Sequence, residues 1–275
     1  MTPGPERVVE LDITSPGNER VKRLRRLRNR RSRDAEGLFV VEEERIISRA
    51  IRAGRQPVEV YWCPELCDRP TGIDAPVVTM SEEAADRASY RTSSSGLIAL
   101  FPYFSFSPHD LELPASPLLL VAESIEKPGN LGALLRIADG AGADGLVVVG
   151  ADVDLFNPNA VRSSTGALFT VQIAVFSDPA NVVDWLEHRG VESLAAVPGG
   201  TTTLWDADLT GPRALWVGSE AFGLSAGALE RLPHTVSIPM AGASDSLNTS
   251  VAAALLVYEA IRQRTTQAGG PANLS

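Results

Sequence analysis

From residue 118 onward, the chain alternates short apolar runs with helix-like segments, and this alternation limits the possible folds more than any other feature. The runs are mostly apolar throughout, which is typical of strands that are buried on both faces of a sheet. They lie near residues 118–122, 145–149, 171–176, 193–197, 214–218 and 236–239. A long final helix is expected to end near Arg264. The pattern predicts an α/β fold with a parallel sheet, and such sheets bind ligands outside the carboxyl ends of their strands.

A smaller α/β unit is expected before this sheet, and a length of 275 residues suits two domains. We assign residues 15–104 to the first domain and residues 117–275 to the second. Residues 105–116 contain prolines and little periodicity, which indicates a linker, and residues 1–14 are expected to be a disordered tail. Within the first domain, strands are predicted at 38–41, 58–62, 76–80 and 96–101, with helices at 43–53 and after the capping residue Ser81.

Positive charge is concentrated between Arg20 and Arg33, although the whole chain has a formal net charge of −9. This stretch contains nine basic residues and no acidic one, which leaves −18 on the remainder. Val21, Leu24 and Leu27 recur at helical spacing, so the stretch predicts an amphipathic helix with one apolar and one cationic face. Local neutralisation of phosphates sets nucleic-acid affinity more than total charge does. We therefore expect this helix to bind RNA, although a solvated helix face would give the same pattern.

Several other classes of protein are disfavoured by what the sequence lacks. It contains no apolar run of about 18 residues and no secretory signal, so we expect a cytoplasmic protein without a membrane span. Cys63 and Cys67 lack the further ligands of a zinc site, and the three histidines are scattered, so free thiols and no metal are expected. The glycine-rich phosphate motifs of dinucleotide enzymes and P-loop NTPases are also missing.

Polar residues and glycines collect at the predicted carboxyl ends of strands in three places: residues 126–136, 216–225 and 238–254. Each cluster also has a purely structural interpretation. Asn130 would cap a helix with Arg136 on its surface, Glu220 would complement a helix dipole, and Ser246 and Asn248 would cap the last helix. Three such clusters at one edge of one sheet nevertheless favour a binding site.

The three clusters resemble, in wording and order, the three motifs of the SpoU (TrmH-like) branch of the SPOUT methyltransferases, which modify ribose 2′-hydroxyls in RNA. The resemblance covers residues 117–264 and implies a SPOUT-type parallel sheet with a C-terminal trefoil knot, which is an exceptional topology. Residues 15–104 resemble the L30e-like α/β substrate-binding domain of many members. In F-V-V-E-E-E-R-I, the family usually has a glycine after the first glutamate, whereas this chain has Glu43. The chain resembles most closely actinobacterial enzymes that act on 23S ribosomal RNA, including antibiotic-resistance methylases.

The resemblance implies that S-adenosylmethionine is the cofactor and that loops of the knot bind it, mostly through backbone groups. Small residues and prolines in these loops suit a pocket that needs close backbone approach. The implied cofactor-binding residues are Val197, Pro198, Gly199, Gly218, Ser219, Glu220, Ile238, Pro239, Met240, Ser246, Leu247 and Asn248.

The resemblance also implies the catalytic residues Arg136, Asn130, Glu220, Ser246 and Asn248. A guanidinium is effectively always protonated, so Arg136 is a poor general base. As a hypothesis, it forks between the substrate phosphate and the developing alkoxide, while a carboxylate or water takes the proton.

Binding of RNA is assigned to the basic stretch and, by resemblance, to the arginine of N-A-V-R-S-S-T-G-A-L-F; the residues are Arg23, Arg26, Arg30, Arg31, Arg33 and Arg162. Family members are homodimers, and the apolar residues 247–258 are expected either to form part of that contact or to pack in the core. Transfer RNA is an alternative substrate. Two other classes stay open: an RNA-binding or ribosome-assembly protein without catalysis, and a small-molecule transferase, whose RNA affinity would be insensitive to salt.

Overall fold

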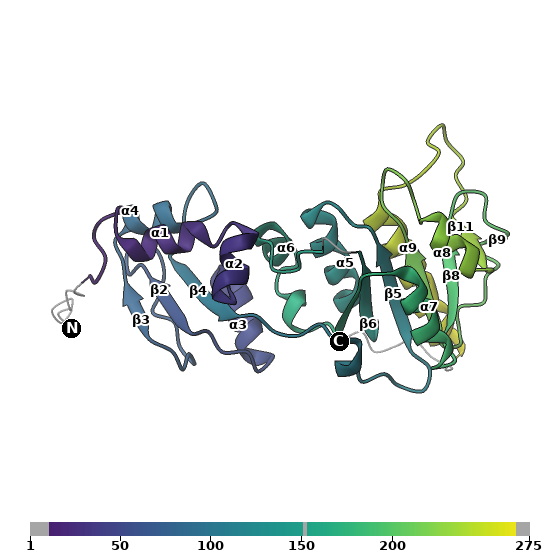
Figure 1. Cartoon of the computed structure of the whole chain (residues 1–275), viewed down its shortest axis with the longest axis horizontal. Helices are drawn as coiled ribbons and strands as arrows, with labels where there is room; N and C mark the ends of the chain where they lie inside the picture. Colours follow the sequence, from purple (N-terminus) through teal and green to yellow (C-terminus); the bar gives the residue numbers. More distant parts are fainter. Residues whose placement is uncertain (1–10, 151–152, 268–275) are drawn as a thin grey trace, which may run out of the picture. The chain divides into compact units, whose positions relative to one another are not determined.

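The computed structural model describes residues 11–150 and 153–267, and these form two compact units (Figure 1). Of the described residues, the first unit contains 11–104 and 156–169, and the second contains 105–150, 153–155 and 170–267. The structure therefore divides the chain differently from the predicted boundaries. The expected linker at residues 105–116 belongs to the second unit, where the carbonyl of Phe106 accepts a hydrogen bond from Val175 N at 2.9 Å.

The first unit is built on a four-stranded sheet in the order β1-β4-β2-β3. β4 pairs antiparallel with β1 and β2, whereas β2 and β3 are parallel. The predicted strands are therefore confirmed, with small shifts of their ends. The strands are β1 (Leu38–Glu42), β2 (Glu59–Trp62), β3 (Val77–Thr79) and β4 (Leu97–Pro102), and the helices are α1 (Glu19–Arg26), α2 (Arg30–Glu36), α3 (Glu44–Arg52) and α4 (Glu82–Ala88).

The basic stretch forms two helices, α1 and α2, where the sequence predicted one. The helix stops at Leu27, and Asn29 starts the second helix by accepting a hydrogen bond from Arg31 N at 2.9 Å. Asparagine favours such a capping position because its side chain competes with helical hydrogen bonds. The predicted apolar face is confirmed, since Val21, Leu24 and Leu27 are at most 1% exposed.

The expected disordered tail is partly ordered. Ile13 N donates to Thr79 O at 3.0 Å, the carbonyl of Ile13 accepts from Ser81 N at 2.9 Å, and the Ile13 side chain is buried. A buried isoleucine with paired backbone groups is ordered structure, so the prediction was wrong for residues 12–14. Residues 1–10 of the expected tail lie outside the described residues.

Residues 156–169 join the first unit through aromatic packing. Phe39 lies with its ring centroid 4.5 Å from that of Phe156 and 6.2 Å from that of Phe169. Arg49 also donates to the carbonyl of Thr165 at 3.0 Å. Offset aromatic pairs stabilise beyond the area that they bury, so this cluster holds the segment firmly. The segment contains α6 (Pro158–Ser163) and the short 3-10 helix η2 (Ala167–Phe169).

The second unit is a seven-stranded sheet in the order β7-β6-β5-β10-β8-β11-β9, and every pairing is parallel. The predicted buried parallel sheet is therefore confirmed, whereas the short strand β9 and helix α8 were not predicted. The elements are η1 (Pro108–Asp110), β5 (Leu118–Glu123), α5 (Pro128–Ala141), β6 (Gly145–Val149), β7 (Ile173–Phe176), α7 (Pro179–Glu187), β8 (Glu192–Ala196), β9 (Thr202–Thr203), β10 (Arg213–Val217), α8 (Ala226–Arg231), β11 (Thr235–Ser237) and α9 (Thr249–Gln267).

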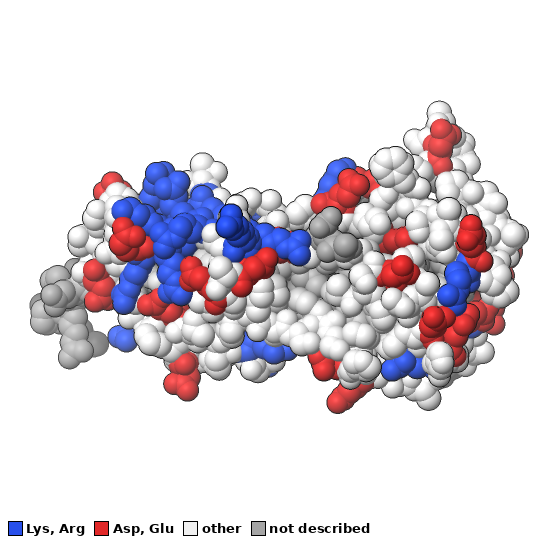
Figure 2. All heavy atoms as spheres, viewed as in Figure 1, with Lys and Arg blue, Asp and Glu red and all other residues white. Residues whose placement is uncertain are grey.

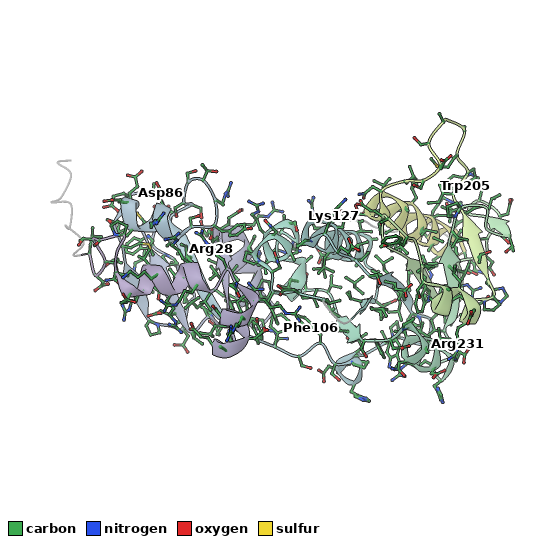
Figure 3. The ribbon with its side chains drawn as sticks, turned by 45° about the horizontal axis from the view of Figure 1, so that its top comes forward. Arg28, Asp86, Phe106, Lys127, Trp205 and Arg231 are labelled. Carbon is green, nitrogen blue, oxygen red and sulfur yellow. The ribbon has the colours of Figure 1, made fainter. Side chains whose placement is uncertain are left out.

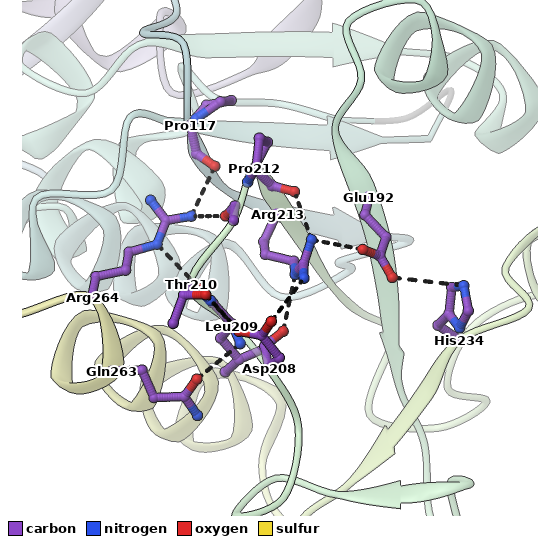
Figure 4. Close-up of polar contacts among 11 residues, drawn as sticks. Pro117, Glu192, Asp208, Leu209, Thr210, Pro212, Arg213, His234, Gln263 and Arg264 are labelled. Atoms are coloured by element: carbon purple, nitrogen blue, oxygen red, sulfur yellow. Dashed lines mark hydrogen bonds and ion pairs between the residues drawn. The ribbon is translucent and has the colours of Figure 1, made fainter. Parts of the chain in front are cut away.

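A half-buried arginine, Arg264, fastens the end of α9 to the amino ends of the strands (Figure 4). Arg264 donates to the carbonyls of Leu209, Gly211 and Pro117 at 2.5 to 3.2 Å. Burial lowers the pKa of Arg264 from its usual value, yet the guanidinium fork satisfies several carbonyls at once. This end of the sheet is therefore closed by structure, and the carboxyl ends of the strands lie at the opposite edge.

The two cysteines of the chain lie in the first unit. Cys63 is buried and Cys67 half-buried, both as free thiols, and burial raises the pKa of Cys63 to about 12. Within residues 11–150 and 153–267, no group of histidine, cysteine or carboxylate side chains is arranged to hold a metal ion. None of the helices in those ranges is long and apolar enough to cross a bilayer.

The position where the family usually has glycine adopts a conformation that suits glycine. Glu43 has φ +78° and ψ 125°, a region that costs a side chain roughly 1 to 3 kcal/mol. Its exposed ion pair with Arg91, at 2.8 Å, compensates only partly because such pairs contribute about 0 to 1 kcal/mol.

We expect Glu43→Gly to unfold at higher urea concentration than Glu43→Ala, with a difference of about 1 kcal/mol in the free energy of unfolding. Both variants lose the ion pair with Arg91, but only glycine relieves the backbone. Equal stability of the two variants would mean that residue 43 is not strained.

Candidate active site

A large cavity lies where the sequence predicted a ligand, beyond the carboxyl ends of β8, β10 and β11. Its volume is about 820 Å³, within the range of cavities that hold ligands of cofactor size. All the predicted cofactor-binding residues except Asn248 line it. These are Val197, Pro198, Gly199, Gly218, Ser219, Glu220, Ile238, Pro239, Met240, Ser246 and Leu247.

The wall after β10 is a tight backbone turn. Ser219 and Gly223 exchange two backbone hydrogen bonds of 3.0 Å, and Gly223 has φ +68°. A Cβ atom on Gly218 would lie 2.0 Å from the carbonyl carbon of Gly223, so only glycine fits there. The buried Thr249 hydroxyl donates to the Gly218 carbonyl at 2.9 Å and ties the start of α9 to this turn.

The charged side chains that line the cavity are both acidic. Glu220 and Asp245 are the carboxylates among its lining residues, which include no lysine, arginine or histidine. Such a wall favours a ligand with a cationic centre and disfavours one bound by its phosphates. A sulfonium such as that of S-adenosylmethionine fits this charge, and exposed backbone groups suit its adenosine.

Glu220 is the centre of a polar cluster on the rim. One carboxylate oxygen accepts from Lys127 and the other from the side-chain amide of Asn248, and Asn130 contributes a further hydrogen bond. Donation from Lys127, followed by that from Asn130, holds the pKa of the Glu220 carboxyl below its usual range. The structure thus brings three of the five predicted catalytic residues together.

Asn248 is both a helix cap and a member of this cluster. Its side-chain oxygen accepts from Ser250 N at 3.0 Å at the start of α9, while its nitrogen donates to Glu220. The structural interpretation of this residue as a helix cap is confirmed, and its assignment as a catalytic residue stays a prediction. A cap fixes the side chain, which also fixes the direction of its amide toward the carboxylate.

The other two predicted catalytic residues lie apart from the hydrogen-bonded cluster. Ser246 lines the cavity from the loop before α9. Arg136 is exposed on α5, and in the described part of the chain it makes no hydrogen bond or ion pair with Glu220, Asn130 or Asn248. Within one chain, the predicted catalytic set is therefore divided among the polar cluster, Ser246 in the cavity lining and the separate guanidinium of Arg136.

Basic side chains gather on one face of the first unit, over α1 and α2 (Figure 2). Arg26 and Arg30 are 56% and 47% exposed, and Arg31 is also exposed. Arg23 is less available, since it donates to Glu36 at 2.7 Å and lies 3.6 Å from Glu59. These residues form a surface that a polyanion can reach.

The assignment of Arg33 to RNA binding was wrong. Arg33 is 0% exposed, and its guanidinium donates to the carbonyls of Leu27 and Arg28 at 3.2 and 2.8 Å. These carbonyls lie at the break between α1 and α2, where the helical hydrogen bonds end. Arg33 is therefore a structural residue, because its guanidinium donates to carbonyls that have no helical partner at the end of α1.

Arg162 lies on α6 and belongs to the first unit. It is exposed and lines a small hollow with Arg28 and Tyr90, whose hydroxyl accepts from Asn159 at 3.0 Å. Arg28 lies 5.6 Å from the centroid of the Tyr90 ring. The structure thus places Arg162 on the same unit as the basic helices, although nearly 130 residues separate them in sequence.

Two residues of these sites were missed by sequence reasoning. Tyr90 gave no signal, because a lone tyrosine in a serine-rich loop has no distinctive pattern. Lys127 gave a weak one: it is one of two lysines in the chain, and it stands inside the first polar cluster.

The comparisons with known proteins agree with the resemblance. Residues 117–258 match the SpoU rRNA Methylase family, and residues 18–99 match the MRM3-like substrate binding domain. A 23S rRNA (uridine(2479)-2′-O)-methyltransferase of Streptomyces viridochromogenes is 43% identical over 142 residues, which span 50% of each chain. The 23S rRNA (guanosine(2553)-2′-O)-methyltransferase RlmP of Bacillus subtilis is 30% identical over 90% of this chain and 97% of that one.

A solved structure is similar over almost the whole chain. The SpoU methyltransferase AviRb from Streptomyces viridochromogenes, in complex with the cofactor AdoMet, has a TM-score of 0.83 and 28% identity, covering 92% of this chain and 100% of that one. The enzyme class and cofactor inferred from the motifs are thereby confirmed. The chain belongs to the SpoU rRNA methylase family and is an RNA methyltransferase that uses S-adenosylmethionine.

Proposed function

We propose that this protein methylates the 2′-hydroxyl of one ribose in 23S ribosomal RNA. The observation that carries the proposal is the cavity of about 820 Å³, whose lining residue Glu220 accepts hydrogen bonds from Asn130 and Asn248. The names of the relatives, which act on 23S rRNA, favour this RNA over transfer RNA. Such an enzyme works in the cytoplasm. Resistance to an antibiotic that binds the ribosome is a candidate for its role in the cell.

The chemistry needs an aligned donor and an oriented hydroxyl. When bound, S-adenosylmethionine supplies an activated methyl group for in-line displacement. The backbone turn at Gly218 and the loop at Ser246, which both line the cavity, would hold the donor. Holding the reacting atoms in line accounts for much of the rate in such reactions. Arg136 binds the substrate phosphate and stabilises charge on the ribose oxygen.

We also propose that the protein acts as a homodimer through α9 and that the C-terminal segment forms the predicted knot. Val251, Leu255 and Tyr258 are 47%, 38% and 51% exposed, and their spacing places them on one stripe of the helix. The opposite stripe, with Leu256 and Val257, is fully buried. The apolar segment thus serves the core on one side and offers a surface for a second copy on the other.

Mapping methylated riboses on ribosomal RNA from cells with and without the gene tests the proposed substrate. A single 23S position should lose its methyl group when the gene is deleted, and purified protein with S-adenosylmethionine should restore it. An unchanged 23S pattern together with a changed transfer RNA would support the alternative substrate instead.

We expect Gly218→Ala to abolish detectable S-adenosylmethionine binding in calorimetry, because its Cβ would collide with the backbone of Gly223. Gly227→Ala, in α8 of the same unit, is the matched control, since nothing lies within 4 Å of its Cβ position. Normal affinity in Gly218→Ala would mean that the cofactor lies elsewhere.

Arg136→Lys should lower kcat by about a hundredfold with little change in cofactor affinity, because lysine keeps the charge and loses the planar fork. Single-turnover methyl transfer to a 23S fragment measures this. Near-normal turnover would defeat the assigned role of Arg136.

Leu255→Glu should convert a dimer to monomers in sedimentation velocity, because a charge at the centre of an apolar contact is left desolvated. Glu230→Ala serves as a control, because Glu230 is exposed on α8 and lies outside the proposed contact. A wild-type protein that sediments as a monomer at micromolar concentration would remove this part of the proposal.

A further inference from the structure

Lys127 is one of the two lysines in the chain, and it contacts Glu220 in the polar cluster. The chain has 25 lysines and arginines in total, and only Lys22 and Lys127 are lysines. Lys127 directly precedes Pro128, which starts α5, and its backbone is extended at φ −84° and ψ 118°. A following proline favours that conformation, so the backbone of Lys127 is fixed while its long side chain reaches outward.

The Lys127 ammonium contacts Glu220, which belongs to the turn after β10. The same carboxylate accepts from Asn248, in the loop before α9, and from Asn130, in the first turn of α5. One side chain therefore joins the segment after β5, the turn after β10 and the loop before α9. Glu123, at the end of β5, has different partners, because it accepts hydrogen bonds from Ser225 N and Oγ at 2.9 and 2.6 Å.

We propose that Lys127 is a positioning residue for methyl transfer, which holds the Glu220 carboxylate so that the amides of Asn130 and Asn248 face the reacting ribose. This inference rests on the proposed function and adds a residue to its site. Lys127 acts through Glu220 and contributes little to RNA affinity.

The exposure of the pair indicates orientation as its role. The Lys127 side chain is 69% exposed and that of Glu220 25%, and pairs in such surroundings contribute little to stability. An anion fixed between three donors, however, has one preferred direction for both of its oxygens.

A double-mutant cycle between Lys127→Ala and Glu220→Gln tests the proposal. We expect Lys127→Ala to lower kcat roughly tenfold, with S-adenosylmethionine and RNA dissociation constants within about twofold of wild type. In the Glu220→Gln background, Lys127→Ala should have no further effect. Lys127→Arg should restore most of kcat because it keeps the cation.

The pH dependence gives a readout that a merely structural lysine would not change. Contact with Lys127 holds the pKa of Glu220 down, so the ionised carboxylate persists to lower pH. Loss of Lys127 raises that pKa toward its ordinary value, and the acidic limb of the kcat profile should therefore move to higher pH. The limb should not move when Lys127→Ala is added to Glu220→Gln.

Arg231→Ala is the matched control, because Arg231 also forms an exposed ion pair, at 2.5 Å with Asp184. Figure 3 shows Lys127 and Arg231 well apart in the second unit. This variant should leave kcat and its pH profile unchanged. Additive effects in the cycle, or a main effect of Lys127→Ala on RNA affinity, would overturn the proposal.

A measurement without turnover separates this inference from the proposed function. In nuclear magnetic resonance spectra of the whole protein, Lys127→Ala should shift or broaden the side-chain amide signals of Asn130 and Asn248. Unchanged signals would refute the positioning role even in an active enzyme. Changed signals in a protein that methylates no RNA would refute the proposed function and leave the contact intact.

Discussion

Parallel pairing of the central strands is the constraint on which the site depends. Because β5, β10, β8 and β11 all run in one direction, the segments after them emerge at one edge of the sheet. The opposite edge is closed by Arg264, which binds carbonyls at the amino ends of the strands. The sheet alone therefore brings the polar loops close to one another. The turn at Gly218 then packs backbone against backbone, which leaves room for a cofactor beside it.

Most strands of this sheet could be predicted from the sequence, because buried parallel strands need continuous apolar runs. The strand at Leu118–Glu123 and the long helix at Thr249–Gln267 were predicted within a few residues. Glycine and proline at the strand ends indicated the cavity wall for the same reason, since close backbone approach excludes larger side chains. The short strand at Thr202–Thr203 was missed because two residues carry no periodicity.

Other features depend on contacts that sequence spacing cannot encode. Residues 156–169 belong with the first unit because Phe156 and Phe169 pack on Phe39, more than a hundred residues away. Arg33 continues an apparently uniform run of arginines, yet a break in the helix turns it inward to satisfy two carbonyls. In both cases, tertiary packing decided between possibilities that local pattern left equal.

The polar cluster also bears on the fate of the ribose proton. Glu220 accepts three hydrogen bonds and has a pKa below its usual range, which makes it a weaker base than a free carboxylate. A guanidinium offers hydrogen-bond donors and no acceptor, so Arg136 is not suited to be the base either. Neither of these two side chains is therefore suited to accept the ribose proton. On that view, the rate depends on alignment of the donor and on stabilisation of the oxygen, and the carboxylate contributes by keeping two amides in place.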